Sequence, residues 1–339
     1  MSIDLRNVTK RFGGFAAVDG VTAHLDQGEF FVVLGPSGCG KSTLLRLIAG
    51  LEMLDGGSID LGPEQVSAPG LHVPPESRAV GVVFQSYALW PHMSVRDNVA
   101  FPAEAQGASR ATARRAAQAH LATVDLGPLA DRMPAALSGG QRQRVALARC
   151  LAGGARSILM DEPLANLDPH LRARMEHEIA RFHREAGVTT LYITHDQREA
   201  MALADRIAVM EQGRFHQVAR PQDIHDRPAT EHVARFIGRA AVLDAHIAGD
   251  ADLGPLTAPL VFGSAHAPGP ARVVIRPGDV RLGEGTPARI ERPVYRGGLW
   301  EAEARVEGLS EPLPVASAQR LDDGARTALR VTAVWPLPG

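Results

Sequence analysis

The stretch that decides the fold reads FFVVLGPSGCGKST and runs from Phe30 to Thr43. Its apolar first part, Phe30 to Leu34, predicts a buried strand, and a glycine-rich turn follows directly. A helix-like stretch, Thr43 to Gly50, comes next. Strand, turn and helix in this order point successive backbone N–H groups and a helix N-terminus at one place. That arrangement predicts a phosphate-binding loop.

The glycine-rich turn matches the phosphate-loop pattern of glycine, four residues, and then Gly-Lys-Ser or Gly-Lys-Thr. Lys41 is expected to reach the β- and γ-phosphates of a nucleotide, while Ser42 ligates Mg²⁺ and Thr43 holds the α-phosphate. A chance Gly/Ser turn beside a solvated lysine is the alternative, and the strand, loop and helix context argues against it. The nucleotide-binding residues predicted here are Gly35, Pro36, Ser37, Gly38, Cys39, Gly40, Lys41, Ser42 and Thr43.

A second apolar run, Ser157 to Met160, ends in two carboxylates, Asp161 and Glu162. Such groups are expected where the carboxyl edge of a sheet meets a nucleotide. Asp161 would hold Mg²⁺ through its water shell, and Glu162 would orient or deprotonate the attacking water. A solvated pair of acids is the plain alternative, which the nearby phosphate-loop pattern makes the weaker one.

Composition limits the class of protein. With 36 Lys plus Arg against 38 Asp plus Glu, the formal charge is −2, so no overall positive field attracts nucleic acid. The apolar runs fall short of the roughly 20 residues of a membrane span. The start, Met1 to Phe12, alternates apolar and polar residues like a strand rather than a signal peptide. The only cysteines, Cys39 and Cys150, suit a reducing compartment, so we expect a cytoplasmic protein.

The 339 residues are enough for two domains. Residues 1–238 alternate short β-rich runs with helical stretches, which predicts an α/β domain with a largely parallel sheet. From 239 to 339, after the helical segment Glu231 to Ile237, Gly and Pro become dense and predict a small all-β barrel or sandwich. The expected strands of the first domain are Ile3 to Val8, Phe30 to Leu34, Val80 to Phe84, Ser157 to Met160, Thr189 to Ile193 and Arg206 to Met210.

A helical insertion interrupts the α/β pattern, at about residues 86–152. Ser109 is a plausible N-cap, and Ala111 to Val124 is rich in Ala and Arg without a strand signal. We therefore expect a helical subdomain between two strands of the sheet.

The stretch Leu137-Ser-Gly-Gly-Gln141 and the Arg-Gln-Arg-Val-Ala-Leu-Ala-Arg149 that follows resemble the signature of the ABC ATPases. Residues 2 to 240 are covered closely by this resemblance. It implies a P-loop NTPase of the ABC type, with ATP and Mg²⁺ as cofactors. An OB-like or barrel domain would then follow it.

The signature loop is a second anion-binding surface, because Ser138 and Gly140 precede an apolar helix. The family resemblance implies a head-to-tail homodimer. In it, Ser138, Gly139, Gly140 and Gln141 of one subunit would cap the γ-phosphate bound by Lys41 of the other. Taken alone, the Ser-Gly-Gly turn is an ordinary helix cap.

Other family elements occur in the expected order, and their roles are what the resemblance implies. Phe12 matches the aromatic residue that stacks on adenine, although an aromatic beside a strand is more often core. Gln85 matches the glutamine that touches Mg²⁺ and water and links the site to the helical insertion. Asp168 matches the loop across the dimer, where Ala165 replaces the usual serine. His195 matches the switch histidine that hydrogen-bonds the γ-phosphate and positions water.

Phe84 to Val99 and Thr194 to Asp205 resemble the importer branch, in particular the subfamily serving sugars, polyamines and ferric iron. The resemblance implies an ATPase at the cytoplasmic face of the inner membrane. Its partners would be two transmembrane permease subunits and, indirectly, an extracytoplasmic solute-binding protein. In this subfamily a β-barrel regulatory domain follows, and Val274 to Val280 is similar to its recurring Arg-Pro-x-Asp-Val stretch.

Two alternatives remain open at this point. A soluble ABC ATPase acting on nucleic acid or ribosomes usually carries two cassettes or a long coiled coil, whereas this chain has one phosphate loop and no heptad run. Separately, the tail could be a ligand-sensing module that regulates the ATPase, which is compatible with the main interpretation. The transported solute is selected by other subunits and is not encoded in this chain.

Overall fold

The computed structural model describes residues 1–165, 167–261 and 266–338. The chain forms two compact units, Met1–Pro221 and Gln222–Gly339, and each has its own core. Within the described residues, none of the helices is long and apolar enough to cross a membrane.

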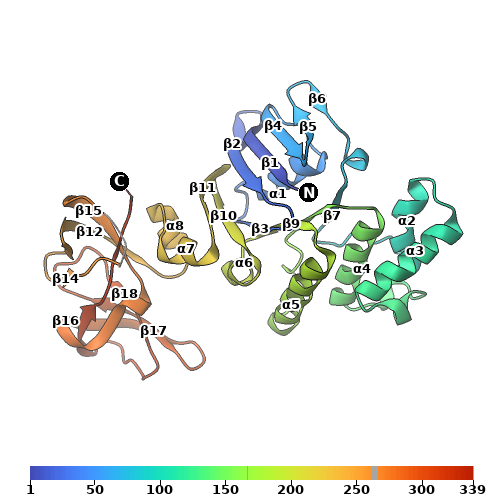
Figure 1. Cartoon of the computed structure of the whole chain (residues 1–339). Helices are drawn as coiled ribbons and strands as arrows, with labels where there is room; N and C mark the ends of the chain where they lie inside the picture. The colour runs from blue at the N-terminus through green and yellow to red at the C-terminus, as the bar shows by residue number, and fades with distance from the viewer. Residues whose placement is uncertain (166, 262–265, 339) are drawn as a thin grey trace. The chain divides into compact units, whose positions relative to one another are not determined.

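A six-stranded sheet forms the centre of the first unit (Figure 1). Strands β10, β3, β9, β8 and β7 run parallel, and β11 pairs antiparallel with β10 at one edge. This confirms the predicted α/β fold and its largely parallel sheet. The strands in spatial order are β11 (Arg214–Ala219), β10 (Arg206–Glu211), β3 (Phe30–Leu34), β9 (Thr189–Thr194), β8 (Ser157–Asp161) and β7 (Val80–Val83).

A second, antiparallel sheet of five strands differs from the sequence prediction, which placed the first strand in one mostly parallel sheet. It forms because β1 pairs with β2 on one side and with β4 on the other. Both sheets and helix α1 (Lys41–Ala49) share one hydrophobic core. The strands in order are β2 (Phe15–Leu25), β1 (Ile3–Phe12), β4 (Gly56–Leu61), β5 (Glu64–Ala68) and β6 (Leu71–His72).

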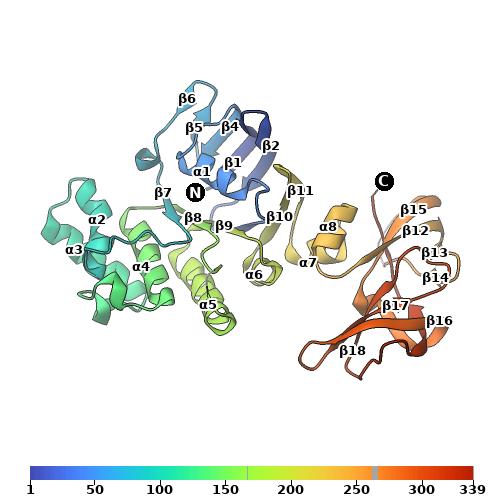
Figure 2. The same cartoon turned by 180° about the vertical axis from the view of Figure 1, so that it is seen from behind.

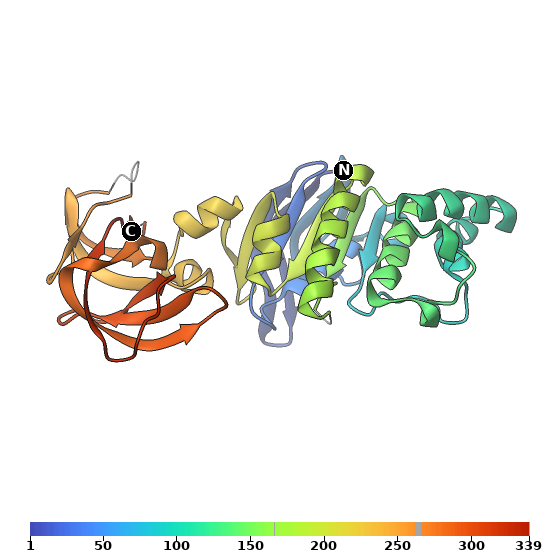
Figure 3. The same ribbon diagram turned by 90° about the horizontal axis from the view of Figure 1, so that it is seen from below.

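The helical insertion consists of α2 (Val95–Ala105), α3 (Arg110–Thr123) and α4 (Gly139–Ala152), which pack on one another beside β7 (Figures 1 and 2). Helix α3 confirms the predicted helix, and Ser109 caps it by accepting a hydrogen bond from Thr112 N at 3.3 Å. Helices α5 (Pro169–Ala186) and α6 (Gln197–Leu203) lie against the central sheet (Figure 3).

The second unit is built mainly from two antiparallel sheets around one core, as the all-β prediction required. It begins before residue 239, the predicted boundary, and includes α8 (Glu231–Phe236). The physical reason is packing: Ala234 of α8 lies in a cluster with Val242, Val274 and Leu337.

One sheet of this unit contains β14 (Thr257–Ala258), β13 (Asp250–Asp252), β12 (Ala241–Ala248), β15 (Gly269–Ile275) and β20 (Trp335–Pro336). The other contains β18 (Leu313–Ser317), β17 (Trp300–Arg305), β16 (Val280–Tyr295) and β19 (Arg326–Val331). A short helix, α7 (Pro221–Asp226), precedes α8.

Candidate functional site

The phosphate loop lies between β3 and α1 and is packed too tightly for side chains at two of its glycines. A Cβ at Gly35 would collide with the Met210 carbonyl oxygen, and one at Gly40 with the Ala17 carbonyl oxygen. Gly40 also has φ of 107°, a left-handed conformation that favours glycine. The sequence pattern is therefore explained by close backbone approach from β2 and β10.

Lys41 begins α1 and is 4% exposed. Its ammonium group donates hydrogen bonds to the carbonyl oxygens of Gly35 and Pro36, each at 2.8 Å. The loop thus wraps around the cation of its own lysine, which places positive charge where the pattern predicts phosphate. Cys39 Sγ lies 4.0 Å from this ammonium, and burial raises the pKa of the Cys39 thiol.

The Ser42 hydroxyl donates to Asp161 Oδ1 at 2.9 Å, which joins the two residues predicted to serve a metal ion. Burial raises the pKa of Asp161, because desolvation disfavours the charged carboxylate. A hydroxyl and a desolvated carboxylate are oxygen donors that fit Mg²⁺. Among the described residues, no three His, Cys, Asp or Glu side chains form a metal-binding group. Mg²⁺ needs none, since it keeps several waters and uses one or two protein ligands.

Glu162 follows β8 in a left-handed conformation with φ of 45°, which is uncommon for a residue with a side chain. Its backbone N–H donates to Ile193 O at 3.0 Å, so the turn is anchored to the neighbouring strand β9. Glu162 Oε2 lies 3.1 Å from His195 Nδ1. The two residues predicted to handle water are therefore in direct contact.

Phe12 and Gln85 are both exposed. The Phe12 ring is 50% exposed at the end of β1, with Lys10 Nζ 5.2 Å from its centre, so it is not a core residue. A free aromatic face is what stacking on adenine requires. Gln85 lies in the turn after β7, whose Val83 pairs with Met160 of β8, so this turn starts at the sheet edge that carries Asp161.

The signature loop caps its own helix. Ser138 Oγ accepts from Gln141 N at 3.3 Å, and Gln141 Oε1 accepts from Ser138 N at 2.9 Å, which forms a capping box on α4. Ser138 is exposed, whereas Gly140 is buried, and a Cβ there would collide with Met175 of α5. The remaining first-turn N–H groups of α4 have no intrahelical acceptor, so the end still favours an anion.

Asp168 caps α5 by accepting a hydrogen bond from Leu171 N at 3.0 Å. The loop before it includes residue 166, which lies outside the described residues. The sequence analysis assigned no role to a group of polar residues next to this loop and His195, namely Arg172, Thr194 and Glu199. Thr194 and Glu199 are buried and Arg172 is largely so. Their spacing in the sequence gives no sign that they meet.

A family model described as ABC transporter matches residues 18–165. A spermidine/putrescine import ATP-binding protein of Pseudomonas aeruginosa is 44% identical over 309 residues, which are 88% of this chain and 84% of that protein. The chain belongs to the ATP-binding subunits of ABC importers. A sulfate/thiosulfate import ATP-binding protein of Nocardia farcinica is 41% identical over 342 residues, 99% of both chains.

Solved structures agree with this assignment. The importer subunit is similar to the dimeric structure of MJ0796, a bacterial ABC transporter cassette, with 31% identity and a TM-score of 0.55. That match covers 65% of this chain and 98% of the cassette. The ADP conformation of a second cassette, MJ1267, matches with 26% identity and a TM-score of 0.59, over 69% of this chain and 98% of that one. The predicted ABC-type ATPase is thereby confirmed, and the nucleic-acid alternative gains no support.

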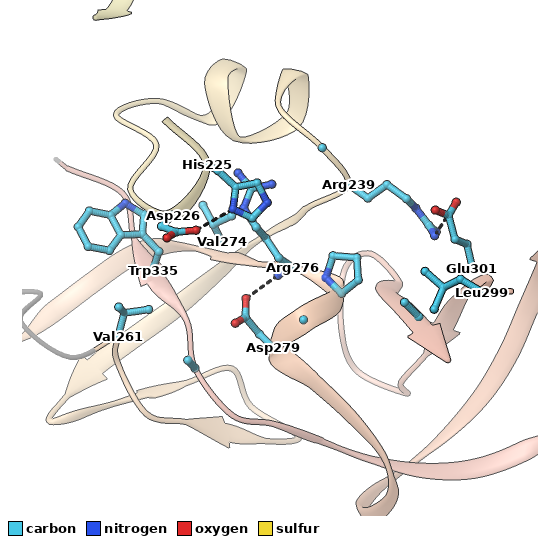
Figure 4. Close-up of a pocket in the computed structure, with 15 residues that line it drawn as sticks. His225, Asp226, Arg239, Val261, Val274, Arg276, Asp279, Leu299, Glu301 and Trp335 are labelled. Carbon is cyan, nitrogen blue, oxygen red and sulfur yellow. Dashed lines mark hydrogen bonds and ion pairs between the residues drawn. The ribbon is translucent and has the colours of Figure 1, made fainter. Parts of the chain in front are cut away.

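The second unit of the importer subunit contains a cavity of about 720 Å³, with Val261, Val274 and Trp335 in its walls (Figure 4). Two acidic side chains around it are bonded to neighbouring residues. Asp226 contacts His225 at 2.7 Å, and Asp279 accepts the backbone N–H of Arg276 at 3.0 Å (Figure 4). The cavity has the size of a small-molecule site.

Proposed function

We propose that this ATPase hydrolyses ATP at a site built from the phosphate loop, the Asp161–Glu162 turn and His195. The observation that carries the proposal is a pair of contacts, Ser42 with Asp161 at 2.9 Å and Glu162 with His195 at 3.1 Å. They bring residues from three separate stretches of the chain to the carboxyl edge of one parallel sheet.

Each of these groups has a distinct task in the proposed reaction. Lys41 and the N-terminus of α1 bind the β- and γ-phosphates, and Thr43 supports the α-phosphate. Ser42, Asp161 and Gln85 hold Mg²⁺, which when bound would neutralise charge on the phosphate oxygens. Glu162 accepts a proton from the attacking water, while His195 orients that water and the γ-phosphate. Phe12 offers its exposed ring to the adenine.

Two copies are proposed to act together. Ser138 is exposed and the first turn of α4 keeps anion-binding N–H groups, so this loop suits a phosphate held by a second subunit. The dimeric cassette with 31% identity supports the formation of a dimer. In the proposed dimer each ATP lies between the phosphate loop of one subunit and the signature loop of the other, and Asp168 lies at the contact.

We infer that the dimer works at the cytoplasmic face of the inner membrane, with two permease subunits and, indirectly, a solute-binding protein. The names of the relatives support a small solute, since they refer to spermidine/putrescine in one case and sulfate/thiosulfate in the other. Coupling to the membrane subunits would pass through Gln85 and the helical insertion of residues 86–152.

We also propose that the second unit regulates the ATPase by binding a ligand in its cavity, because that cavity is large enough for a small molecule. The test titrates sulfate or spermidine into the whole protein while ATP hydrolysis and thermal stability are measured. A response of both quantities that Trp335→Ala removes is expected. No response to any small solute imported by its relatives would contradict a regulatory role for the cavity.

Hydrolysis by the purified chain tests the catalytic assignment. Lys41→Ala is expected to abolish most ATP binding, because it removes the buried cation of the phosphate loop. Glu162→Gln should keep ATP binding and lose roughly 10²–10⁴-fold in rate, the usual worth of general-base catalysis. Glu185→Gln, an exposed glutamate on α5, is the matched control. Wild-type rates in Glu162→Gln would overturn the assignment of the base.

A further inference from the structure

Arg172, near the start of α5, lies between two loops of the ATPase site. Its Nη2 donates to Leu167 O at 3.1 Å, in the loop predicted to cross the dimer. Its Nη1 donates to Asp196 Oδ2 at 3.2 Å, directly after His195. The Arg172 side chain is 22% exposed, so water screens these contacts only in part. One rigid guanidinium thus joins the loop at Asp168 to the loop at His195.

The backbone around His195 is held from behind by a buried carboxylate. The Thr194 hydroxyl donates to Glu199 Oε2 at 2.7 Å and accepts from Asp196 N at 3.0 Å. The Tyr192 hydroxyl donates to the same Glu199 oxygen at 2.8 Å. Glu199 is only 3% exposed, and burial raises its pKa. Hydrogen bonds therefore fix Thr194 and Asp196, the residues on both sides of His195, and Arg172 binds Asp196.

One donor of Arg172 is unused in this arrangement. Its Nε is buried and has no hydrogen-bond partner within the part of the chain that the structure describes. Glu199 Oε1 lies 3.7 Å from it, close enough for charge attraction but too far for a good hydrogen bond. A shift of roughly 1 Å would complete that bond, given ordinary N–H···O distances of about 2.9 Å. A small movement of Arg172 would therefore replace the present Arg172–Glu199 charge contact by a hydrogen bond.

We propose that Arg172 is a positioning residue that couples the cross-dimer loop to His195. When a second subunit engages the loop at Asp168, Arg172 transmits the displacement to Asp196 and Glu199 and so sets the position of His195 against the γ-phosphate. The proposal rests on the proposed function of His195. It assigns no contact with ATP to Arg172 itself.

A purely structural role for Arg172, anchoring α5, makes different predictions. Lysine keeps the charge and much of the length but lacks the planar fork that reaches both loops at once. Arg172→Lys should therefore keep the fold and ATP affinity while His195 is misplaced. A displacement of about 1 Å can cost on the order of 10²-fold in rate, so we expect kcat to fall roughly 10- to 100-fold.

A double-mutant cycle tests the coupling. ATP affinity, kcat and thermal stability are measured for wild type, Arg172→Lys, His195→Ala and the double variant, with exposed Arg174→Lys on the same helix as control. Because Arg172 acts through His195, the double variant should be about as slow as His195→Ala alone. Asp196→Asn, which retains a helix-capping side chain, should likewise lower kcat and add little to Arg172→Lys.

Three outcomes would overturn parts of this scheme in different ways. If the two rate losses multiply in the double variant, Arg172 does not act through His195. If Arg172→Lys lowers ATP affinity or thermal stability as much as it lowers the rate, its role is structural. If His195→Ala hydrolyses ATP at the wild-type rate, the proposed function of His195 fails, and the coupling fails with it.

Discussion

Cys39 is the residue whose chemistry reports most directly on the phosphate loop. It is 6% exposed and follows the left-handed Gly38, in the middle of the turn that encloses the Lys41 ammonium. A bound nucleotide would cover this turn. We therefore expect the reactivity of the thiol to depend on whether the site is occupied.

We predict that alkylation of Cys39 is slow, that it accelerates as pH rises, and that ATP or ADP slows it further. Burial raises the pKa of this thiol above its ordinary value, so the reactive thiolate becomes abundant only at higher pH than for a free cysteine. The rate is measured by mass spectrometry in Cys150→Ser, which removes the other cysteine. Equal rates with and without nucleotide would show that the thiol does not face the bound phosphates.

Strand β7 connects the central sheet, at the edge that carries Asp161, with the helical insertion. It pairs with β8, and the chain then turns at Gln85 toward α2. Just before β7, buried Arg78 donates hydrogen bonds to Leu47 O and Ile48 O near the end of α1, at 2.8 and 2.9 Å. The same guanidinium also reaches Val66 O and Val73 O. The helix of the phosphate loop and the strand leading to Gln85 are thus tied together.

Gln85→Ala is predicted to impair transport more than basal ATP hydrolysis, because the exposed Gln85 lies between the site and the helical insertion. Transport is measured in vesicles containing the permease subunits, and hydrolysis in the same preparation. Neighbouring Ser86→Ala, also exposed, serves as the control. A matched loss of both activities in Gln85→Ala would mean that the glutamine is purely catalytic.

Arg78→Met is predicted to destabilise the first unit by on the order of 3–5 kcal/mol, because it removes every hydrogen bond that the buried guanidinium donates to the carbonyl oxygens around it. Arg181→Met removes a cation of the same type from an exposed pair with Asp125, where the two side chains are 40% and 62% exposed, and should cost about 1 kcal/mol or less. Urea unfolding of the two variants gives the comparison. Equal midpoints would show that Arg78 does not clamp α1.

The fold was predictable where local pattern and tertiary structure agree. The apolar runs of β3, β8, β9 and β10 are buried on both faces, so they read as strands of a parallel sheet. The antiparallel sheet was missed because β4 and β5 are mixed in polarity and β6 has only two residues. Each of these strands pairs with a strand elsewhere in the chain, and the sequence of a short segment does not indicate its partner or its register.

The same division applies to the site. The positions of Lys41, Asp161 and His195 were predictable because their motifs directly follow apolar strands, and their roles stay predictions. Arg172 and Glu199 were not, because their importance comes from burial and from partners on other elements. The domain boundary fell earlier than residue 239 for a related reason. Helix α8 packs its apolar side on the second unit. The sequence of the helix alone does not indicate which of the two units it packs against.

The proposed ATPase site has two halves, and each chain provides both. The phosphate loop and Glu162 form one half, and the Ser138 loop forms the other. Ser138 and Gln141 form two hydrogen bonds with each other at the N-terminus of α4. This end of the helix is therefore already ordered before a second subunit binds. The dimer should therefore be stable only while ATP bridges the halves.

The most direct test is the mass of Glu162→Gln in solution with ATP and Mg²⁺, measured by light scattering. This substitution keeps the shape of the site and removes the base, so ATP should persist and a dimer should accumulate where wild type is mostly monomeric. Adding Ser138→Arg should restore the monomer by blocking the signature loop. If Glu162→Gln with bound ATP remains monomeric, the composite site across two subunits is contradicted.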